Sequence, residues 1–151
     1  MKVREYLHFA AGLKGIPAVK RKSEVERVME RLKITDVQKR LIRNLSKGYK
    51  QRVGFAQALL GDPPVLILDD PFSALDRSTE DTVFAALQAY ANDKVVFLIS
   101  HRLYHFPQLQ NIIFMGDGKT TVGTHEELLQ SSDIYREVYD SQNKAGGENH
   151  G

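Results

Sequence analysis

The chain has 151 residues, 42% of them hydrophobic, and no cysteine, so it can bury a core but excludes a disulfide framework, a thiolate metal site and a cysteine nucleophile. No apolar run approaches the roughly 20 residues that span a bilayer, and the first residues lack the apolar core of a secretion signal. Residues 1–52 hold 15 Lys and Arg against 5 Asp and Glu, and residues 53–151 hold 6 against 14, so the basic half suits nucleic acid, anionic lipid, a polyphosphate ligand or simply a solvated helix surface.

Apolar side chains recur at helical spacing in the first part of the chain. Residues Val3–Leu13 are predicted to form an amphipathic helix that ends before Gly15 and Pro17. A second helix is predicted to begin at Ser23, because Ser23 and Glu26 form a capping-box pattern. We expect the two helices to pair as a small helical unit.

A third helix and a strand–helix–strand unit are predicted next. Ser46 is the natural N-cap of the helix, which we expect to end at the Gly-Asp-Pro-Pro segment. The short apolar runs at 65–68 and 95–100 are predicted strands, the first of them buried on both faces. A helix that begins at Asp76 or Ser78 separates the strands, so they should be parallel neighbours.

The last part of the chain is predicted to form a hairpin and two helices. Two strands flank the turn residues 116–118, and Thr124 with Glu127 forms a second capping-box pattern at the start of a short helix. A last helix is predicted at 134–139. The polar tail 143–151 is expected to be disordered.

Polar side chains follow both predicted parallel strands. Asp69 and Asp70 come after the first strand, and Ser100 and His101 after the second. Ligands of parallel α/β sheets gather at the carboxyl ends of the strands, and Mg²⁺ commonly binds through one or two carboxylates plus substrate phosphates. The pattern therefore predicts Asp69 as a metal ligand, Asp70 as the group that orients or deprotonates a water, and His101 as a contact to a transferred phosphate.

The start of the predicted third helix is a candidate anion site. Ser46 and Gly48 precede or open the helix at the positive end of its dipole, and Lys47 adds a charge. Ordinary helix capping explains the same residues, so this pattern alone does not decide between the two interpretations.

Four motifs together resemble the nucleotide-binding domain of ATP-binding-cassette (ABC) transporters. The stretch LSKGYKQRVGFAQALLGDPPVLILDDPFSALD at 45–76, followed by LISHR at 98–102, is similar to the signature, Walker B motif, D-loop and switch histidine of that domain. Residues 3–17 resemble the helical subdomain that precedes the signature. Residues 122–142 resemble the end of an exporter-type cassette.

The resemblance implies an α/β fold of the P-loop NTPase type, present in part: a helical subdomain, a parallel βαβ core and a C-terminal hairpin with helices. It assigns the helical subdomain to 1–47 and the signature helix, core and C-terminal helices to 48–142, before the tail at 143–151. It also implies that ATP binding and hydrolysis, with Mg²⁺, drive transport through a head-to-tail dimer of two nucleotide-binding domains.

The resemblance further implies a role for each motif residue. Asp69 would bind Mg²⁺, and Asp70 and His101 would be catalytic. The signature would contact an ATP held by the partner domain, and the D-loop would reach that partner. These residues are Leu45, Ser46, Lys47 and Gly48 in the signature, and Ser73 and Asp76 in the D-loop. Transmembrane permease domains would hold the chain at the cytoplasmic face of the membrane, and no nucleic acid is expected.

The sequence departs from the family pattern in three respects. The phosphate-binding pattern G-x-x-x-x-G-K-S/T does not occur, because the GKT at 118–120 has Ile113 where the first glycine would stand. We therefore expect the sequence to begin in mid-domain, and the isolated chain neither to bind ATP tightly nor to hydrolyse it. Asp70 stands where the family usually has glutamate, and Lys47 and Tyr49 replace its commonest glycine and glutamine.

Three alternatives stay open. The chain could be a non-catalytic remnant that binds a partner cassette, or a soluble ABC ATPase that acts on nucleic acid or a ribosome, although such proteins carry coiled-coil insertions or two cassettes. His101 and His105 could pair on zinc, but no third ligand stands at a suitable spacing. His8, His125 and His150 are interpreted as surface or capping residues.

Overall fold

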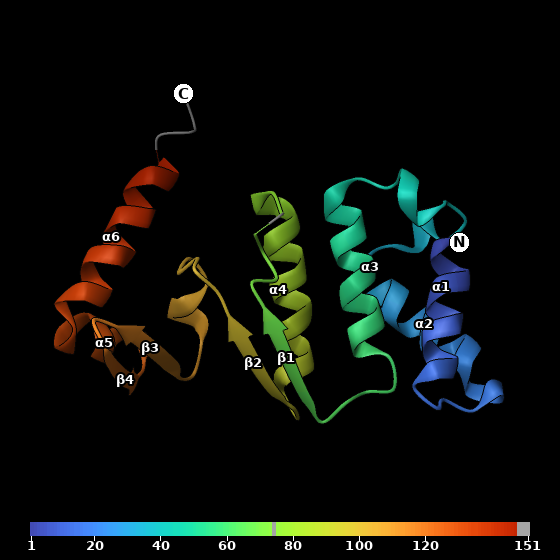
Figure 1. The fold of residues 1–151 in the computed structure, drawn as a ribbon, viewed down its shortest axis with the longest axis horizontal. Helices are drawn as coiled ribbons and strands as arrows, with labels where there is room; N and C mark the ends of the chain where they lie inside the picture. The colour runs from blue at the N-terminus through green and yellow to red at the C-terminus, as the bar shows by residue number, and fades with distance from the viewer. Residues whose placement is uncertain (74, 148–151) are drawn as a thin grey trace. The chain divides into compact units, whose positions relative to one another are not determined.

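The computed structural model describes residues 1–73 and 75–147, which divide after Ile99 into two units (Figure 1). The first unit contains α1 (Val3–Leu13), α2 (Ala18–Arg31), α3 (Lys47–Leu59), β1 (Val65–Asp69), α4 (Arg77–Ala91) and β2 (Val95–Ile99). The second contains β3 (Ile112–Gly116), β4 (Lys119–Gly123), α5 (His125–Ser131) and α6 (Asp133–Gly147). Across the described residues, no helix is long and apolar enough to cross a membrane. The domain boundaries expected at 47 and 142 stay predictions.

Helices α1, α2 and α3 pack against one another in the first unit, which confirms the predicted pairing of the first two helices. Each helix buries a stripe of apolar side chains, represented by Leu7, Val28 and Val53. The Lys14 ammonium donates hydrogen bonds to the carbonyl oxygens of Ala58 and Leu60, at 2.8 and 3.0 Å. Carbonyl groups at the end of α3 accept no hydrogen bond from within the helix, and the Lys14 ammonium supplies their donor.

Helix α2 begins earlier than the capping-box pattern predicts. Its N-cap is Pro17, whose carbonyl accepts hydrogen bonds from the N–H groups of Lys20 and Arg21. The Ser23 hydroxyl donates to the carbonyl of Lys20 at 2.9 Å, inside the helix. The predicted start at Ser23 is therefore wrong, because a Ser and a Glu three residues apart also occur in a helix interior, and the residues before Ser23 have good helix propensity.

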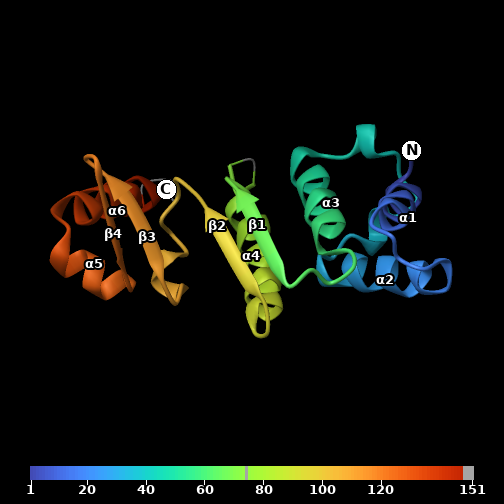
Figure 2. The same cartoon turned by 60° about the horizontal axis from the view of Figure 1, so that its bottom comes forward.

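Strands β1 and β2 pair in parallel, with Asp69 opposite Ile99, and α4 covers one face of the pair (Figure 2). The predicted βαβ unit and α/β fold class are confirmed. Burial alternates along β1, so the expectation of a strand buried on both faces is wrong. Leu66 and Leu68 are buried, whereas the opposite face stays exposed in the described part of the chain. That exposed sheet face consists of Val65, Ile67, Val95, Phe97 and Ile99, each 49–66% exposed.

The exposed sheet face is expected to drive self-association of the isolated chain, because contiguous apolar surface of this kind is an aggregation hazard. Replacing Ile67 and Phe97 together by Thr keeps β propensity and removes apolar area, so the monomer fraction on size-exclusion chromatography should rise several-fold. The double replacement of Ile113 and Met115 by Thr removes similar exposed side chains from β3 and serves as the control. An equal gain from both variants would contradict a specific role for the β1–β2 face.

The second unit confirms the predicted hairpin and both predicted helices. Strands β3 and β4 pair antiparallel, and Thr124 and Glu127 form the predicted capping box of α5. Helix α6 continues to Gly147, into the first residues of the predicted tail, and the expected disorder stays a prediction. The Gln142 side chain accepts from the N–H of Leu103 at 2.9 Å, which ties the last turns of α6 to the core of this unit. The rest of the predicted tail, 148–151, lies outside the described residues. The core residues are Leu103, Phe106, Ile112, Leu128 and Tyr135.

Candidate functional site

The start of α3 has the predicted capping geometry. Ser46 is the N-cap, and its hydroxyl accepts a hydrogen bond from the N–H of Tyr49 at 3.4 Å. Leu45, just before it, is buried, whereas Lys47 is exposed. The N–H groups of the first turn have no acceptor within the helix. The helix therefore presents N–H donors and a positive dipole end at a polar surface, anchored by a buried leucine.

Gly48 is not required by the packing of the chain. A Cβ added there would lie 3.8 Å from Thr79 Cγ2 and 3.9 Å from Leu75 Cδ2, which is ordinary van der Waals contact. The residue is helical, in a position where glycine costs stability relative to alanine. A glycine that the fold does not need is consistent with close approach of another molecule to the backbone at this point.

The side chain of Tyr49 fixes the first turn of α3. Its hydroxyl donates to the Asp36 carboxylate at 2.6 Å, and the guanidinium carbon of Arg52 lies 4.1 Å from the centre of its ring. Arg52 also donates to the carbonyl of Lys33 at 3.1 Å. Sequence reasoning identified Tyr49 as a residue at helical spacing and as a departure from the family pattern, but nothing in the local pattern pairs it with a residue 13 positions earlier.

Asp69 and Asp70 lie together at the carboxyl end of β1, as predicted. Asp69 is the last residue of the strand and is exposed, and Asp70 is half-buried. Asp70 has a left-handed backbone, with φ 41°, and its N–H donates to the carbonyl of Ile99 at 2.8 Å. Neither carboxylate makes a hydrogen bond or an ion pair within the described residues. Both are therefore available to an external cation or a water.

The carboxylate pair fits Mg²⁺ by its donor chemistry, because hard oxygen ligands suit this ion and it keeps several waters or phosphate oxygens in its coordination shell. Among residues 1–73 and 75–147, no group of three or more His, Cys, Asp or Glu side chains could hold a metal ion alone. A magnesium ion here would therefore depend on ligands from a bound phosphate. The predicted role of Asp69 as its ligand stays a prediction.

The predicted D-loop residues have structural roles in the chain itself. The Ser73 hydroxyl donates to the carbonyl of Asp70 at 3.2 Å. Asp76 is the N-cap of α4, and its carboxylate accepts from the N–H of Thr79 at 3.0 Å and from the Thr79 hydroxyl at 2.8 Å. The hydrogen bond from the Thr79 N–H is the main reason that the pKa of Asp76 lies below its ordinary value. Helix capping at Asp76 is thus confirmed, and contact with a partner stays a prediction.

His101 belongs to the second unit. Its side chain is exposed, and its carbonyl accepts a hydrogen bond from the Gln142 amide at 2.7 Å. It follows Ile99, the residue opposite Asp69 in the strand pair, by two positions. His105 is buried with its ring centre 4.8 Å from that of Tyr104, so the two histidines differ in environment in a way that does not favour a shared zinc ion.

A hollow in the first unit lies between α3 and the end of β1. The Gln51 amide crosses it and donates to the carbonyl of Pro71, directly after the two aspartates. Asp69 is therefore one wall of a depression whose other wall is the helix that begins at Ser46. The lining residues are Gln51, Gly54, Phe55, Ala58, Leu68, Asp69 and Pro71.

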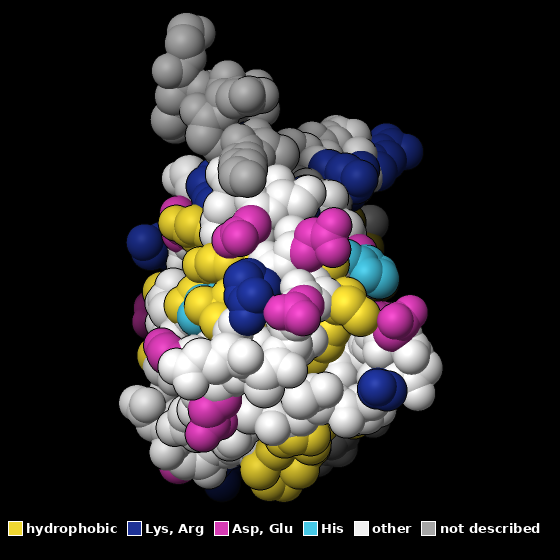
Figure 3. Space-filling view, turned by 90° about the vertical axis from the view of Figure 1, so that its left-hand side faces the viewer, with side chains coloured by type: hydrophobic (Ala, Val, Ile, Leu, Met, Phe, Trp, Pro, Cys, Tyr) yellow, Lys and Arg dark blue, Asp and Glu magenta, His cyan; other side chains and the backbone are white. Residues whose placement is uncertain are grey.

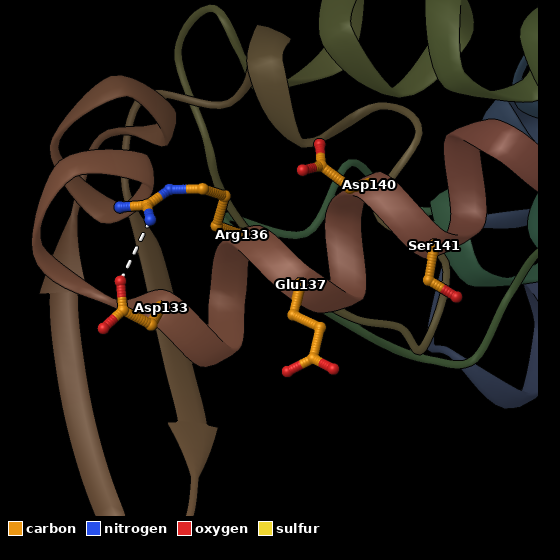
Figure 4. A pocket seen from close by; sticks show the side chains of 5 residues that line it. All are labelled: Asp133, Arg136, Glu137, Asp140 and Ser141. Carbon is orange, nitrogen blue, oxygen red and sulfur yellow. Dashed lines mark hydrogen bonds and ion pairs between the residues drawn. The ribbon is translucent and has the colours of Figure 1, made fainter.

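A second hollow lies along α6 and contains none of the predicted site residues (Figure 4). Arg136 pairs with Asp133 at 3.0 Å and also donates to the carbonyl of Leu129. Glu137 and Asp140 extend from the same helix. Figure 3 shows acidic side chains spread over this face of the second unit rather than gathered at one point. The hollow is a solvated acidic helix surface.

Comparison with known proteins gives the same family as the sequence motifs. Residues 1–73 match the family model described as ABC transporter. The chain is 31% identical over 140 residues to "ABC transporter A family member 1" of Dictyostelium discoideum, covering 92% of this chain and 16% of that protein. It is 37% identical over 134 residues to "Uncharacterized ABC transporter ATP-binding protein YhaQ" of Bacillus subtilis, covering 87% of this chain and 45% of YhaQ.

The fold is also similar to a solved structure. A structure of a bacterial Atm1-family ABC exporter with ATP bound superposes with a TM-score of 0.78 at 25% identity, covering 93% of this chain and 26% of that chain. The chain thus spans less than half the length of each of these relatives.

Proposed function

Because the chain belongs to the ABC transporter family, we propose that it forms part of an exporter-type ATP-binding cassette that couples ATP binding and hydrolysis to transport across a membrane. The observation that carries this proposal is the pair Asp69 and Asp70. Neither carboxylate has a hydrogen-bond or ion-pair partner among residues 1–73 and 75–147, and they lie at the carboxyl end of a parallel strand. The same unit contains the capped helix start at Ser46. Carboxylates that take a metal and N–H groups that take a phosphate are two of the requirements of phosphoryl transfer.

The start of α3 would contact an ATP held by a second cassette. The N–H groups of Lys47 and Gly48 lack acceptors in the helix and would donate to the terminal phosphate, while Ser46 offers its hydroxyl. The absent side chain at Gly48 would let the phosphate approach the backbone. Leu45 anchors this turn in the core.

The end of β1 would serve an ATP held in cis. Asp69 would bind Mg²⁺, which supplies positive charge to the phosphate oxygens as the bond to the leaving group breaks. Asp70 would orient the attacking water and accept its proton, and His101 would contact the transferred phosphate. Ser73 and Asp76 would lie towards the second cassette. Membrane permease domains would convert closure and opening of the dimer into transport.

A matched pair of glycine variants tests the signature role of α3. We propose a chimera in which this chain replaces the matching segment of YhaQ, with intact YhaQ as the positive control. Gly48→Ala should lower ATP turnover of the chimera at least tenfold, because a methyl group would meet the phosphate. Gly54→Ala is the control in the same helix: Gly54 lines the hollow beside Asp69, but an added Cβ there has nothing within 4 Å, so turnover should stay unchanged.

Both variants should raise the free energy of unfolding of the chain by about 0.5–1 kcal/mol, measured by urea unfolding, since alanine is the better helix former. A loss of turnover on Gly48→Ala thus cannot be attributed to damage to the fold. Equal turnover of the two variants would contradict the signature role. A chimera that binds ATP without turnover would favour a non-catalytic cassette.

A further inference from the structure

The connection between α1 and α2 exposes large apolar side chains. Leu13 ends α1 and is 74% exposed, and Val19, the second residue of α2, is 89% exposed. Phe9, one helical turn before Leu13, is 55% exposed. Single exposed apolar residues are ordinary on a protein surface, but three of them within residues 9–19 are a concentrated apolar feature.

The same segment is cationic. Residues 6–23 contain four Lys and Arg and no Asp or Glu. The nearest carboxylates are engaged elsewhere, because Glu5 pairs with Lys2, Glu24 with Arg27 and Glu26 with Arg4. No carboxylate within the segment therefore offsets its positive charge.

Two of the four cations are committed to the fold and two are not. Lys14 and Arg21 donate to backbone carbonyls, and burial lowers the pKa of Lys14. Lys20 and Lys22 are exposed and lie one and three positions after Val19. Exposed ammonium groups beside exposed aliphatic side chains are complementary to a surface that carries negative charge on its outside and apolar groups beneath that charge.

We propose that the α1–α2 connection, residues 9–22, binds anionic lipid at a membrane surface. Leu13 and Val19 enter the boundary between headgroups and acyl chains, and Lys20 and Lys22 contact lipid phosphates. Nucleic acid also attracts cations, but single strands are bound by stacking successive bases on aromatic rings, and residues 9–22 expose one ring, Phe9, beside the aliphatic Leu13 and Val19. The lipid contact requires neither ATP nor the carboxylates of β1.

Co-sedimentation of the full chain with vesicles tests the lipid contact. Binding to vesicles of phosphatidylcholine with one-third phosphatidylglycerol should exceed binding to phosphatidylcholine alone at least tenfold, and should weaken with salt. The Lys20→Glu, Lys22→Glu double variant should weaken binding about 30-fold, since each cation near an anionic surface contributes several-fold. The Leu13→Ser, Val19→Ser variant should weaken it about tenfold.

A matched control variant separates this site from general charge. Lys39→Glu with Arg40→Glu makes the same charge change at exposed residues of the same unit and should lower binding less than threefold. Circular dichroism checks that each variant is folded. Equal loss in the two charge variants, no preference for anionic vesicles, or tight binding of a single-stranded oligonucleotide through the same residues would each overturn the proposal.

Discussion

Replacing Asp70 by Glu in the YhaQ chimera is expected to raise ATP turnover about 100-fold. The proposed role of Asp70 is to orient and deprotonate the attacking water, and the backbone fixes its position. Its N–H donates to the carbonyl of Ile99, and its own carbonyl accepts from Ser73. The carboxylate therefore cannot move forward by a backbone shift, and a side chain one methylene longer would bring it about 1 Å closer. A displacement of this size can change the rate by about 10²-fold.

The left-handed backbone at Asp70 should make the Asp70→Glu variant less stable, even though its turnover is expected to rise. Asp is several-fold enriched at positive φ among non-glycine residues, and Glu is tolerated less well. We expect Asp70→Glu to lower the free energy of unfolding by about 1 kcal/mol, measured by urea unfolding. Aspartate at position 70 thus suits the left-handed turn, whereas glutamate would extend the carboxylate farther from the backbone.

Two further variants make the Asp70 result specific. Asp70→Asn keeps the side-chain shape and the left-handed backbone but removes the base, so turnover should fall to background. Asp93→Glu makes the same chemical change at an exposed residue after α4 and should leave turnover unchanged. An unchanged or lower rate for Asp70→Glu would contradict the proposed catalytic role. The measurement is phosphate release at saturating ATP and Mg²⁺.

Sequence reasoning succeeded where a local rule determines the structure. The N-caps Ser46, Asp76 and Thr124 are all confirmed, because a short polar side chain before an apolar helical pattern satisfies N–H groups that no other residue can reach. The same rule failed at Ser23. There a Ser and a Glu three residues apart lie inside a helix that had already begun at Ala18.

Features that depend on distant residues carried no sequence signal. The exposure of one face of β1 depends on which elements pack against the sheet, so the apolar run alone could not distinguish a strand buried on both faces from one covered by α4. The positive φ of Asp70 depends on hydrogen bonds to Ile99 and Ser73. The Tyr49–Asp36 contact depends on how two helical segments meet. The placement of Asp69 and Asp70 was predictable, because the carboxyl end of an apolar strand follows from the sequence pattern.

His125 is the clearest case of a residue whose environment the sequence did not reveal. It was interpreted as a surface or capping residue, but it is buried at the first position of α5. Its Nδ1 shares a hydrogen bond of 2.8 Å with the Tyr135 hydroxyl, and its ring centre lies 4.5 Å from that of Tyr139. The contact spans 10 residues across the α5–α6 corner, so no periodic pattern marks it. It forms a polar pair inside the apolar core of the second unit.

The Tyr135 hydroxyl should make the stability of the second unit sensitive to alkaline pH. Burial, aided by Tyr139 and Glu126, raises the pKa of Tyr135 to about 12 from its ordinary 10. A raised pKa in the folded state gives stability that is fully present below pH 10 and is lost as pH rises to 12. The loss corresponds to two pKa units, or about 3 kcal/mol. Tyr135→Phe should remove this pH dependence, because phenylalanine cannot ionise.

The same variant should be less stable than wild type at pH 8 by about 1–2 kcal/mol, because His125 loses its buried hydrogen-bond partner. The two stability curves should therefore cross between pH 10 and 12, in guanidinium unfolding followed by circular dichroism. Comparing variant with wild type cancels the contribution of Tyr90, whose pKa burial also raises. Tyr104→Phe, at an exposed tyrosine of the same unit, should keep the alkaline loss. A Tyr135→Phe stability curve that ran parallel to the wild-type curve through pH 12 would contradict ionisation of Tyr135 as the cause of the alkaline loss of stability.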